Sequence, residues 1–301
     1  MNYYGKELNA YKAAFHQHST VSDGLFTPEQ MIEAYSKKGY DIYAFTDHEI
    51  ANPVSTYDGK GMTLISGMEI HPMGPRGERW HILGLGLPED FKHPVTCPET
   101  TAEECIEAVH KVGGIAFCAH PVFCGFRSEE VAKVKGWDGM EFFNSDCRFA
   151  GKGYSVLTGC ELADEGILLN SIAVDDAHSR RDFFNGWTML LTDKPLSQAS
   201  VIEALKAGTF YATQGPQFTS VNYKDGFFEA EFTPCTEVIG LSFKWRGYCA
   251  MCENLNGPED GIREITSCRI KIKNDIKNNN WFRLQIKDKN GHYAWTNPIW
   301  A

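Results

Sequence analysis

The feature that most constrains the fold is an alternation of short apolar runs with helix-like stretches, from the start of the chain to about residue 210. Thr27-Pro28 predicts the start of one helix, because Thr caps helix N-termini and Pro suits the first helical position, and Gly39 ends it. A second helix is predicted over residues 101–112. The apolar runs predict strands at residues 11–15, 41–46, 62–66, 80–85, 115–119, 139–143 and 168–174. Strands that alternate with helices predict an α/β fold with a parallel sheet or barrel.

The pattern changes near Gly215-Pro216, and strand and turn sequence follows. Residues 221–232 alternate around Asp225-Gly226, a dipeptide typical of tight hairpin turns, and Asn290-Gly291 follows a second alternating stretch. The sequence therefore predicts two domains. Residues 1–215 form the α/β domain, and residues 216–301 form a small antiparallel β domain of the sandwich type.

The composition limits the expected binding partners and the expected cellular location of the protein. The net charge is −10 and no run of Lys or Arg occurs, which argues against general nucleic-acid binding, although a small phosphorylated substrate remains compatible. The first residues lack the basic start and apolar stretch of a signal peptide, and no apolar run approaches the roughly 20 residues of a membrane span. The ten cysteines are scattered through the predicted elements. We expect reduced thiols, a cytoplasmic location and no membrane contact.

Histidine and acidic residues gather where the predicted strands meet loops. His16 and His18 stand two apart in a strand-like stretch, so both side chains can point to one side and reach one ion. His81 stands at the beginning of its predicted strand, which indicates an antiparallel or edge strand there. Six of the ten histidines lie in such motifs. The further motifs are Thr46-Asp47-His48, Gly67-Met68-Glu69, Cys118-Ala119-His120 and Asp175-Asp176-Ala177-His178. Buried charged groups are costly unless they pair or bind a metal, and imidazole with carboxylate suits Zn, Fe or Mn.

The order of these motifs resembles the polymerase and histidinol phosphatase (PHP) family of metal-dependent phosphoesterases, over about residues 11–215. The resemblance implies a distorted seven-stranded β/α barrel with two or three divalent ions. The segment 204–217 and the ending Trp295-Thr296-Asn297-Pro298-Ile299-Trp300 look like a bacterial subset in which a β-rich segment follows the metal domain. The implied ligands are His16, His18 and Asp176 for the first ion, Glu69 as its bridge to the second, His81 and His120 for the second, and Asp23, His48 and His178 for the third.

The resemblance also implies a reaction, which is hydrolysis of a phosphomonoester or phosphodiester of a small metabolite by a metal-bridging hydroxide. Glu69, Asp176 and His178 are the expected catalytic groups, and a metal-bound water or His178 would protonate the leaving group. Arg148, Arg180 and Arg181 are candidates for holding the free phosphate oxygens, with a solvated surface role as the alternative.

Two other functions stay open at this point. Some relatives cleave carbon esters such as carbamates, so a carboxylester or carbamate hydrolase with the same ions is the first alternative. A non-catalytic metal- or glycan-binding protein is the second.

Several neighbouring groups are less clear. His71 follows Glu69 by two residues and is either a further group of the site or a supporting or surface histidine. Asp47 and Asp175 stand beside proposed ligands and are expected to orient an imidazole. Cys249 and Cys252 have zinc-like spacing, but a single pair is weak support for a structural zinc.

Overall fold

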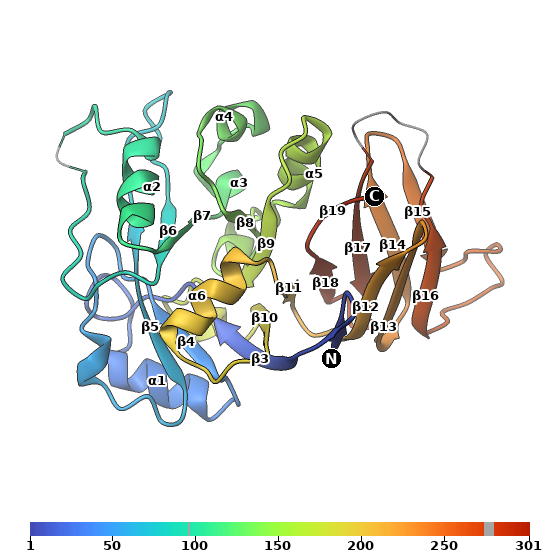
Figure 1. Cartoon of the computed structure of the whole chain (residues 1–301), viewed down its shortest axis with the longest axis horizontal. Coiled ribbons are helices and arrows are strands. Elements are labelled where there is room, and N and C mark those ends of the chain that lie inside the picture. Colours follow the sequence, from blue (N-terminus) through green and yellow to red (C-terminus); the bar gives the residue numbers. More distant parts are fainter. Residues whose placement is uncertain (96, 274–279) are drawn as a thin grey trace.

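A large mixed sheet forms the centre of the molecule in the computed structural model, which describes residues 1–95, 97–273 and 280–301 (Figure 1). Its neighbouring strands run in the order β11-β10-β3-β4-β5-β6-β7-β8-β9. These strands are β3 (Asn9–Ala14), β4 (Ile42–Phe45), β5 (Thr63–Ile70), β6 (Ile82–Leu85), β7 (Ile115–Cys118), β8 (Gly139–Asn144), β9 (Asn170–Val174), β10 (Trp187–Thr192) and β11 (Phe210–Thr213). Strands were therefore correctly predicted at all seven apolar runs, although β5 extends four residues further and includes Glu69.

Helices connect these strands. They are α1 (Pro28–Ser36), α2 (Ala102–Lys111), α3 (Pro121–Cys124), α4 (Ser128–Lys133), α5 (Val156–Asp164) and α6 (Gln198–Lys206). Short 3₁₀ turns occupy Val54–Thr56, Cys147–Ala150 and Arg180–Asp182. Both predicted helices are confirmed, and each begins with a capping box, in which the Thr27 or Thr101 hydroxyl accepts from the third helical amide. Among the described residues, no helix is long and apolar enough to span a membrane.

The direction of β6 decides where the metal motifs meet. β3, β4 and β5 are parallel, as are β7, β8 and β9, whereas β6 runs antiparallel to both β5 and β7. The beginning of β6 therefore lies at the carboxyl ends of its neighbours. His81, directly before β6, thus reaches the same edge as His120, directly after β7. The antiparallel strand expected at His81 is confirmed.

The two ends of this sheet approach each other at β9 and β10. The Thr188 hydroxyl on β10 accepts from the amide of Ala173 on β9 and donates to the carbonyl of the same residue. No backbone ladder joins β9 to β10 within the described ranges. The arrangement is compatible with the expected seven-stranded barrel, and the α/β class with a β-rich C-terminal region is confirmed.

The β-rich region lies at one end of the molecule, in orange to red in Figure 1. Its strands are β12 (Phe218–Lys224), β13 (Phe227–Cys235), β14 (Glu237–Ser242), β15 (Gly247–Met251), β16 (Ile265–Lys271), β17 (Trp281–Lys287), β18 (Tyr293–Thr296) and β19 (Ile299–Trp300). Apolar side chains of β12, β13 and β16 share one buried cluster with those of β14 and β17, as in a sandwich. The hairpin around Asp225-Gly226 is confirmed, and both residues take the positive φ values that a tight hairpin turn requires.

The N-terminal residues join this β-rich region, which the sequence did not indicate. β1 (Asn2–Tyr3) pairs with β12 in parallel and with β2 (Lys6–Glu7) in antiparallel fashion. In addition, β18 pairs with β11, so the large sheet continues into the C-terminal region. The division into residues 1–215 and 216–301 remains our proposal.

Candidate metal centre

One edge of the large sheet gathers all nine predicted ligands. His16 and His18 follow β3, His48 follows β4, Glu69 lies near the end of β5, and Asp176 and His178 follow β9. Parallel strands, together with the reversed β6, place these positions at one edge, as expected for the carboxyl ends of strands in α/β folds. The side chains of the resulting cluster lie from fully buried at its floor to half exposed at Asp23.

Glu69 lies at the centre of the cluster, with imidazoles around both of its oxygens. Its side chain is 1% exposed. The contacts of Oε1 are with His81 Nδ1 at 2.7 Å and His120 Nε2 at 3.1 Å, and those of Oε2 are with His16 Nε2 and His18 Nε2 at 3.4 Å and His48 Nδ1 at 2.8 Å. One carboxylate that faces two sets of imidazoles has the geometry of a bridging ligand.

Asp176 joins His16 and His18, the imidazoles beside Glu69 Oε2, to form the first set of ligands. Its Oδ1 lies 3.3 Å from His16 Nε2 and 3.0 Å from His18 Nε2, on the same side as Glu69 Oε2. The backbone of Asp176 holds φ = 51°, and that of His120 holds φ = 25°, both in a region that residues other than glycine seldom adopt. Such strain persists only where the surrounding structure enforces it, and it is typical of functional sites.

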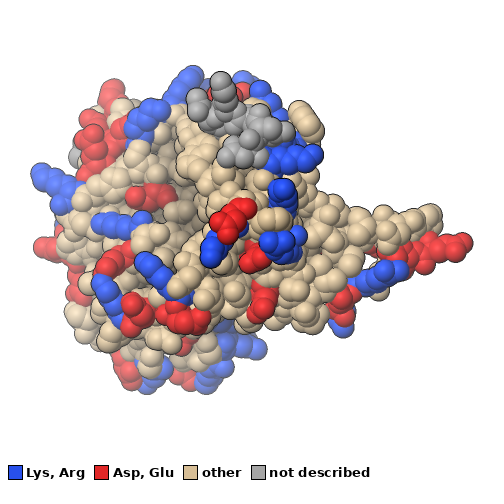
Figure 2. Space-filling view, turned by 45° about the vertical axis from the view of Figure 1, so that its right-hand side comes forward, with Lys and Arg blue, Asp and Glu red and all other residues tan. Residues whose placement is uncertain are grey.

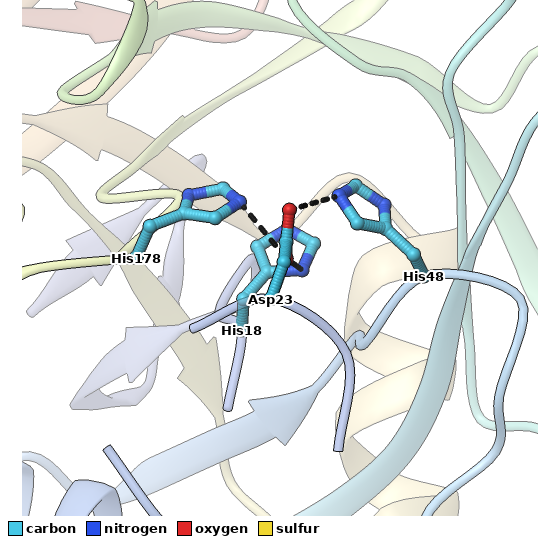
Figure 3. A group of neighbouring side chains, drawn as sticks. All are labelled: His18, Asp23, His48 and His178. Atoms are coloured by element: carbon cyan, nitrogen blue, oxygen red, sulfur yellow. Dashed lines mark ion pairs between the residues drawn. The ribbon is translucent and has the colours of Figure 1, made fainter. Parts of the chain in front are cut away.

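Asp23, His48 and His178 form the third set, beside His18 (Figure 3), and they are more exposed than Glu69 and His16. Asp23 contacts both imidazoles of this set. Its Oδ1 lies 3.4 Å from His178 Nε2, and its Oδ2 lies 3.4 Å from His48 Nε2. The Nδ1 atom of His18 also approaches Asp23, at 3.7 Å, so the His18 ring lies between the first and third sets. The His178 Nδ1–H donates to the Asp176 carbonyl at 2.8 Å, which leaves the lone pair on Nε2 free to bind an ion.

Electrostatics favour ionised carboxylates in this cluster. Burial acts to raise the pKa of Glu69, but the imidazoles of His81 and His16 hold it well below its ordinary value. The pKa of Asp176 is held well below its ordinary value in the same way, against the effect of burial, by His16 and His18. Burial acts to lower the pKa of His18, but its contacts with Asp176 and Glu69 raise that pKa to about 9. Binding of an ion must therefore displace a proton from His18, whereas burial lowers the pKa of His81 to about 4 and keeps that imidazole neutral.

The donor set fits divalent transition-metal ions. Within the described residues, several buried atoms that point into the cluster have no hydrogen-bond partner, including Glu69 Oε2, Asp176 Oδ1 and His48 Nδ1. Buried carboxylate oxygens without partners are costly, so an ion at this position would satisfy them. Mixed imidazole and carboxylate donors are those preferred by Zn, Fe and Mn.

Glu141 supports the cluster and was missed by the sequence reasoning. It lies on β8, where Oε1 is 2.6 Å from His16 Nδ1 and Oε2 accepts from the His120 amide and the Asn144 side chain. A carboxylate on Nδ1 directs the opposite ring nitrogen toward the metal. The only sequence signal was an acidic residue inside an otherwise apolar strand.

The expected role of Asp47 and Asp175 was wrong. In the described structure neither bonds to an imidazole, and both organise loops instead. Asp47 accepts from the Ser19 amide and the Asn52 side chain. Asp175 accepts from the Tyr35 hydroxyl and the amides of three consecutive residues, 184–186. These carboxylates act one step further out, on the loops that carry the ligands.

The three candidate arginines lie in two of the 3₁₀ turns, and in the parts of the chain that the structure describes they make no hydrogen bond or ion pair with the nine residues. The guanidinium groups of Arg148 and Arg181 lie 4.8 and 4.3 Å from the ring centre of Phe149. Arg181 also pairs with Asp146 at 3.3 Å. Arg180 lies 5.5 Å from the ring of Phe26. Their role toward a substrate remains a proposal.

Replacing Glu141 with Gln tests how the cluster is supported. The amide group would place donors against the His120 amide and the Asn144 side chain, so the pair with His16 would be disturbed. We expect metal affinity to fall by about 10–100-fold, the usual effect of losing an outer carboxylate. Chelator-competition titration measures it, with the exposed helical Glu161→Gln as the matched control. Equal affinities in the two variants would contradict this role.

Comparison with known proteins agrees with this geometry. The model of the PHP domain family matches residues 14–181, more than half of the 301-residue chain. A phosphoribosyl 1,2-cyclic phosphate 1,2-diphosphodiesterase of Eggerthella lenta is 35% identical over 79 residues, which are 25% of this chain and 30% of that protein. The 5′-3′ exoribonuclease Rnm of Escherichia coli is 32% identical over 88 residues, 27% of this chain and 29% of that protein. The chain thus spans less than a third of these two relatives.

Two further proteins extend the match. An uncharacterised protein of Methanocaldococcus jannaschii is 31% identical over 129 residues, 41% of this chain and 69% of that protein. A two-domain protein from Bacteroides vulgatus, which contains a predicted PHP-like metal-dependent phosphoesterase, aligns over 97% of this chain and 96% of its own, with a TM-score of 0.54 and 17% identity. That structural likeness shows a shared fold across both regions. Family match, fold and ligand geometry agree, and the chain belongs to the PHP domain family.

Proposed function

We propose that this protein is a metal-dependent hydrolase of phosphate esters that holds up to three divalent ions on His16, His18, Asp23, His48, Glu69, His81, His120, Asp176 and His178. The observation that carries the proposal is the buried Glu69 carboxylate, whose two oxygens face separate sets of imidazoles. A purely structural ion is normally enclosed by a closed set of ligands, whereas this cluster opens to solvent at Asp23. The named relatives that act on phosphodiesters and RNA support the same class of reaction.

The ions would supply a hydroxide at neutral pH and offset charge on the phosphoryl oxygens. The side chains of the protein hold and orient these groups. Glu69 and Asp176 provide the negative charge at the floor of the cluster, and Glu141 fixes the ring of His16. His178, at 25% exposure, lies nearer the entrance, where a leaving group would depart. Its Nδ1 bond to a backbone carbonyl favours metal binding through Nε2 over proton donation.

A small phosphorylated metabolite is the substrate class that we propose. On the face shown in Figure 2, Lys and Arg side chains are interspersed with Asp and Glu, and no broad basic surface appears there. Arg148 and Arg181, which both lie near the ring of Phe149, are the proposed contacts for phosphate oxygens outside the metal shell, together with Arg180. We also propose a cytoplasmic location, which suits the ten free cysteines of the chain.

Activity assays separate the candidate functions. Purified protein loaded with Mn or Zn would be tested on phosphomonoesters, phosphodiesters and aryl carboxylesters. We expect turnover of phosphate esters that depends on added metal. Turnover of carboxylesters alone would favour the carboxylester alternative, and no turnover of either class at full metal occupancy would contradict a catalytic role.

His178→Ala tests the third set of ligands. Removing this imidazole leaves only Asp23, His48 and His18 around that position, so the site should lose about one ion per chain while the others stay bound. Elemental analysis of the purified protein measures the stoichiometry. His292→Ala, a half-exposed histidine in the turn between β17 and β18, is the matched control. An unchanged metal content in His178→Ala would contradict the assignment.

A further inference from the structure

We propose that His71 is a metal ligand in addition to the nine, and that its Nε2 binds an ion held by Glu69 Oε2, next to His48. This inference rests on the proposed metal centre but not on the reaction that the centre catalyses. His71 follows Glu69 by two residues, directly after β5, so its side chain points to the same side of the strand as Glu69. The structure places it inside the cluster, with its ring centre 4.2 Å from that of His81 and 4.5 Å from that of His48.

The free nitrogen of His71 points toward the central carboxylate. Nε2 lies 3.5 Å from Glu69 Oε2, and His48 Nδ1 lies 2.8 Å from the same oxygen. One atom from each of these three side chains lies within 4.8 Å of the other two, a separation that a single ion can span. His71 is only 11% exposed, so this position belongs to the interior of the site.

The three atoms also lack other partners. In the described residues, His71 Nε2, His48 Nδ1 and Glu69 Oε2 are all out of contact with solvent, and none of them makes a hydrogen bond. The close approach of His48 Nδ1 to Glu69 Oε2 is therefore not aligned as a hydrogen bond. A histidine with a merely structural role would be expected to satisfy its buried nitrogen with a protein partner. Converging Nε2 and Oε2 atoms without protein partners have the geometry of an ion-binding position.

The opposite side of His71 is supported as a ligand would be. Glu49 Oε1 accepts from the His71 amide at 2.6 Å and lies 3.4 Å from the ring Nδ1. The other oxygen of Glu49 lies 3.0 Å from His93 Nδ1, so this carboxylate lies near two imidazoles. Glu49 itself has φ = 60°, a strained backbone for a non-glycine residue. A carboxylate on the Nδ1 side with Nε2 toward Glu69 is also found at His16, where Glu141 makes the closer contact of 2.6 Å.

Metal titration of His71→Ala tests this assignment. We expect the affinity for one ion, measured with Zn²⁺ against a chromophoric chelator, to fall by more than the roughly 10–100-fold that loss of an outer partner causes. Glu49→Gln leaves the His71 ligand in place but weakens its support. Its loss of metal affinity should lie within that smaller range. His110→Ala, which changes a histidine on α2 outside the cluster, is the matched control and should bind as the wild type does.

A Co²⁺ spectrum and a second variant distinguish failure of the His71 assignment from failure of the proposed metal centre. The absorption spectrum of the Co²⁺-substituted protein should change in His71→Ala and not in His110→Ala, because the spectrum reports the ligands of the ion. If His71→Ala fails to fold, His71→Gln is measured in its place. Wild-type affinity and an unchanged Co²⁺ spectrum in the folded variant would overturn the role of His71 alone. A wild-type protein that binds no metal would instead overturn the proposed centre.

Discussion

Replacing Glu69 with Gln is expected to reduce phosphoesterase activity by more than about 100-fold while leaving the fold intact. Loss of a supporting carboxylate costs about 10–100-fold in such sites, and Glu69 contacts both sets of imidazoles directly. The amide has the same shape but no charge, so it cannot hold two ions together. Activity at saturating metal, together with metal content, measures the effect.

The control for this variant removes a similar charge elsewhere. Glu107→Gln lies on the exposed face of α2 and should retain full activity and metal content. Circular dichroism and thermal melting should show that both variants are folded. A fully active Glu69→Gln protein with wild-type metal content would rule out the bridging role, whatever the substrate proves to be.

Removal of the metal ions is the second change with a large expected effect. An ion that binds only the folded state stabilises it by about 4 kcal/mol when present at 1,000 times its Kd. For a domain of this size, each such ion raises the Tm by roughly 10 °C. We therefore expect a chelator to lower the Tm by about 10 °C or more, and added Zn or Mn to restore it. Differential scanning calorimetry with and without chelator measures the difference.

The difference in Tm between the metal-bound and the metal-free protein should widen as the pH rises from about 6.5 to about 9. Without metal, the raised pKa of His18, at about 9, stabilises the fold fully below the ordinary histidine pKa of about 6.5, and this contribution is lost as the pH approaches 9. Metal binding instead strengthens with pH, because protons compete with the ion for the imidazoles. A Tm difference that shrinks over this range would contradict pairing of these imidazoles with Glu69 and Asp176 in the metal-free protein.

The main elements of the fold were predictable because their signals are local. Thr27 and Pro28 mark the start of α1 by capping chemistry alone, and the Asp225-Gly226 turn follows from the positive φ values of a tight hairpin. The position of His81 at the beginning of its predicted strand indicated an antiparallel or edge strand, and β6 is antiparallel to both of its neighbours. In contrast, the pairing of β1 with β12 joins residues that are more than two hundred positions apart, and no local pattern reveals such a contact.

In the candidate site, too, some residues could be predicted from the sequence and others could not. Eight of its nine predicted ligands lie beside strand ends, where chain order and the direction of the strands are enough to bring them together, and Asp23 lies in the loop between β3 and α1. The supporting groups depend on side-chain orientation across the sheet. Glu141 contacts His16 from a position 125 residues away. Asp47 stands beside His48 in sequence, yet it bonds to Ser19, so adjacency in the chain was misleading.

The measurement that tests the central claim most directly is a crystal structure of the protein grown with Mn²⁺, with anomalous scattering used to locate the ions. We expect ions on both sides of Glu69, bound to the His16, His18 and Asp176 set and to the His81 and His120 set, and a third beside Asp23, His48 and His178. An anomalous map without peaks in this cluster, or with ions only at other positions on the protein, would contradict the account.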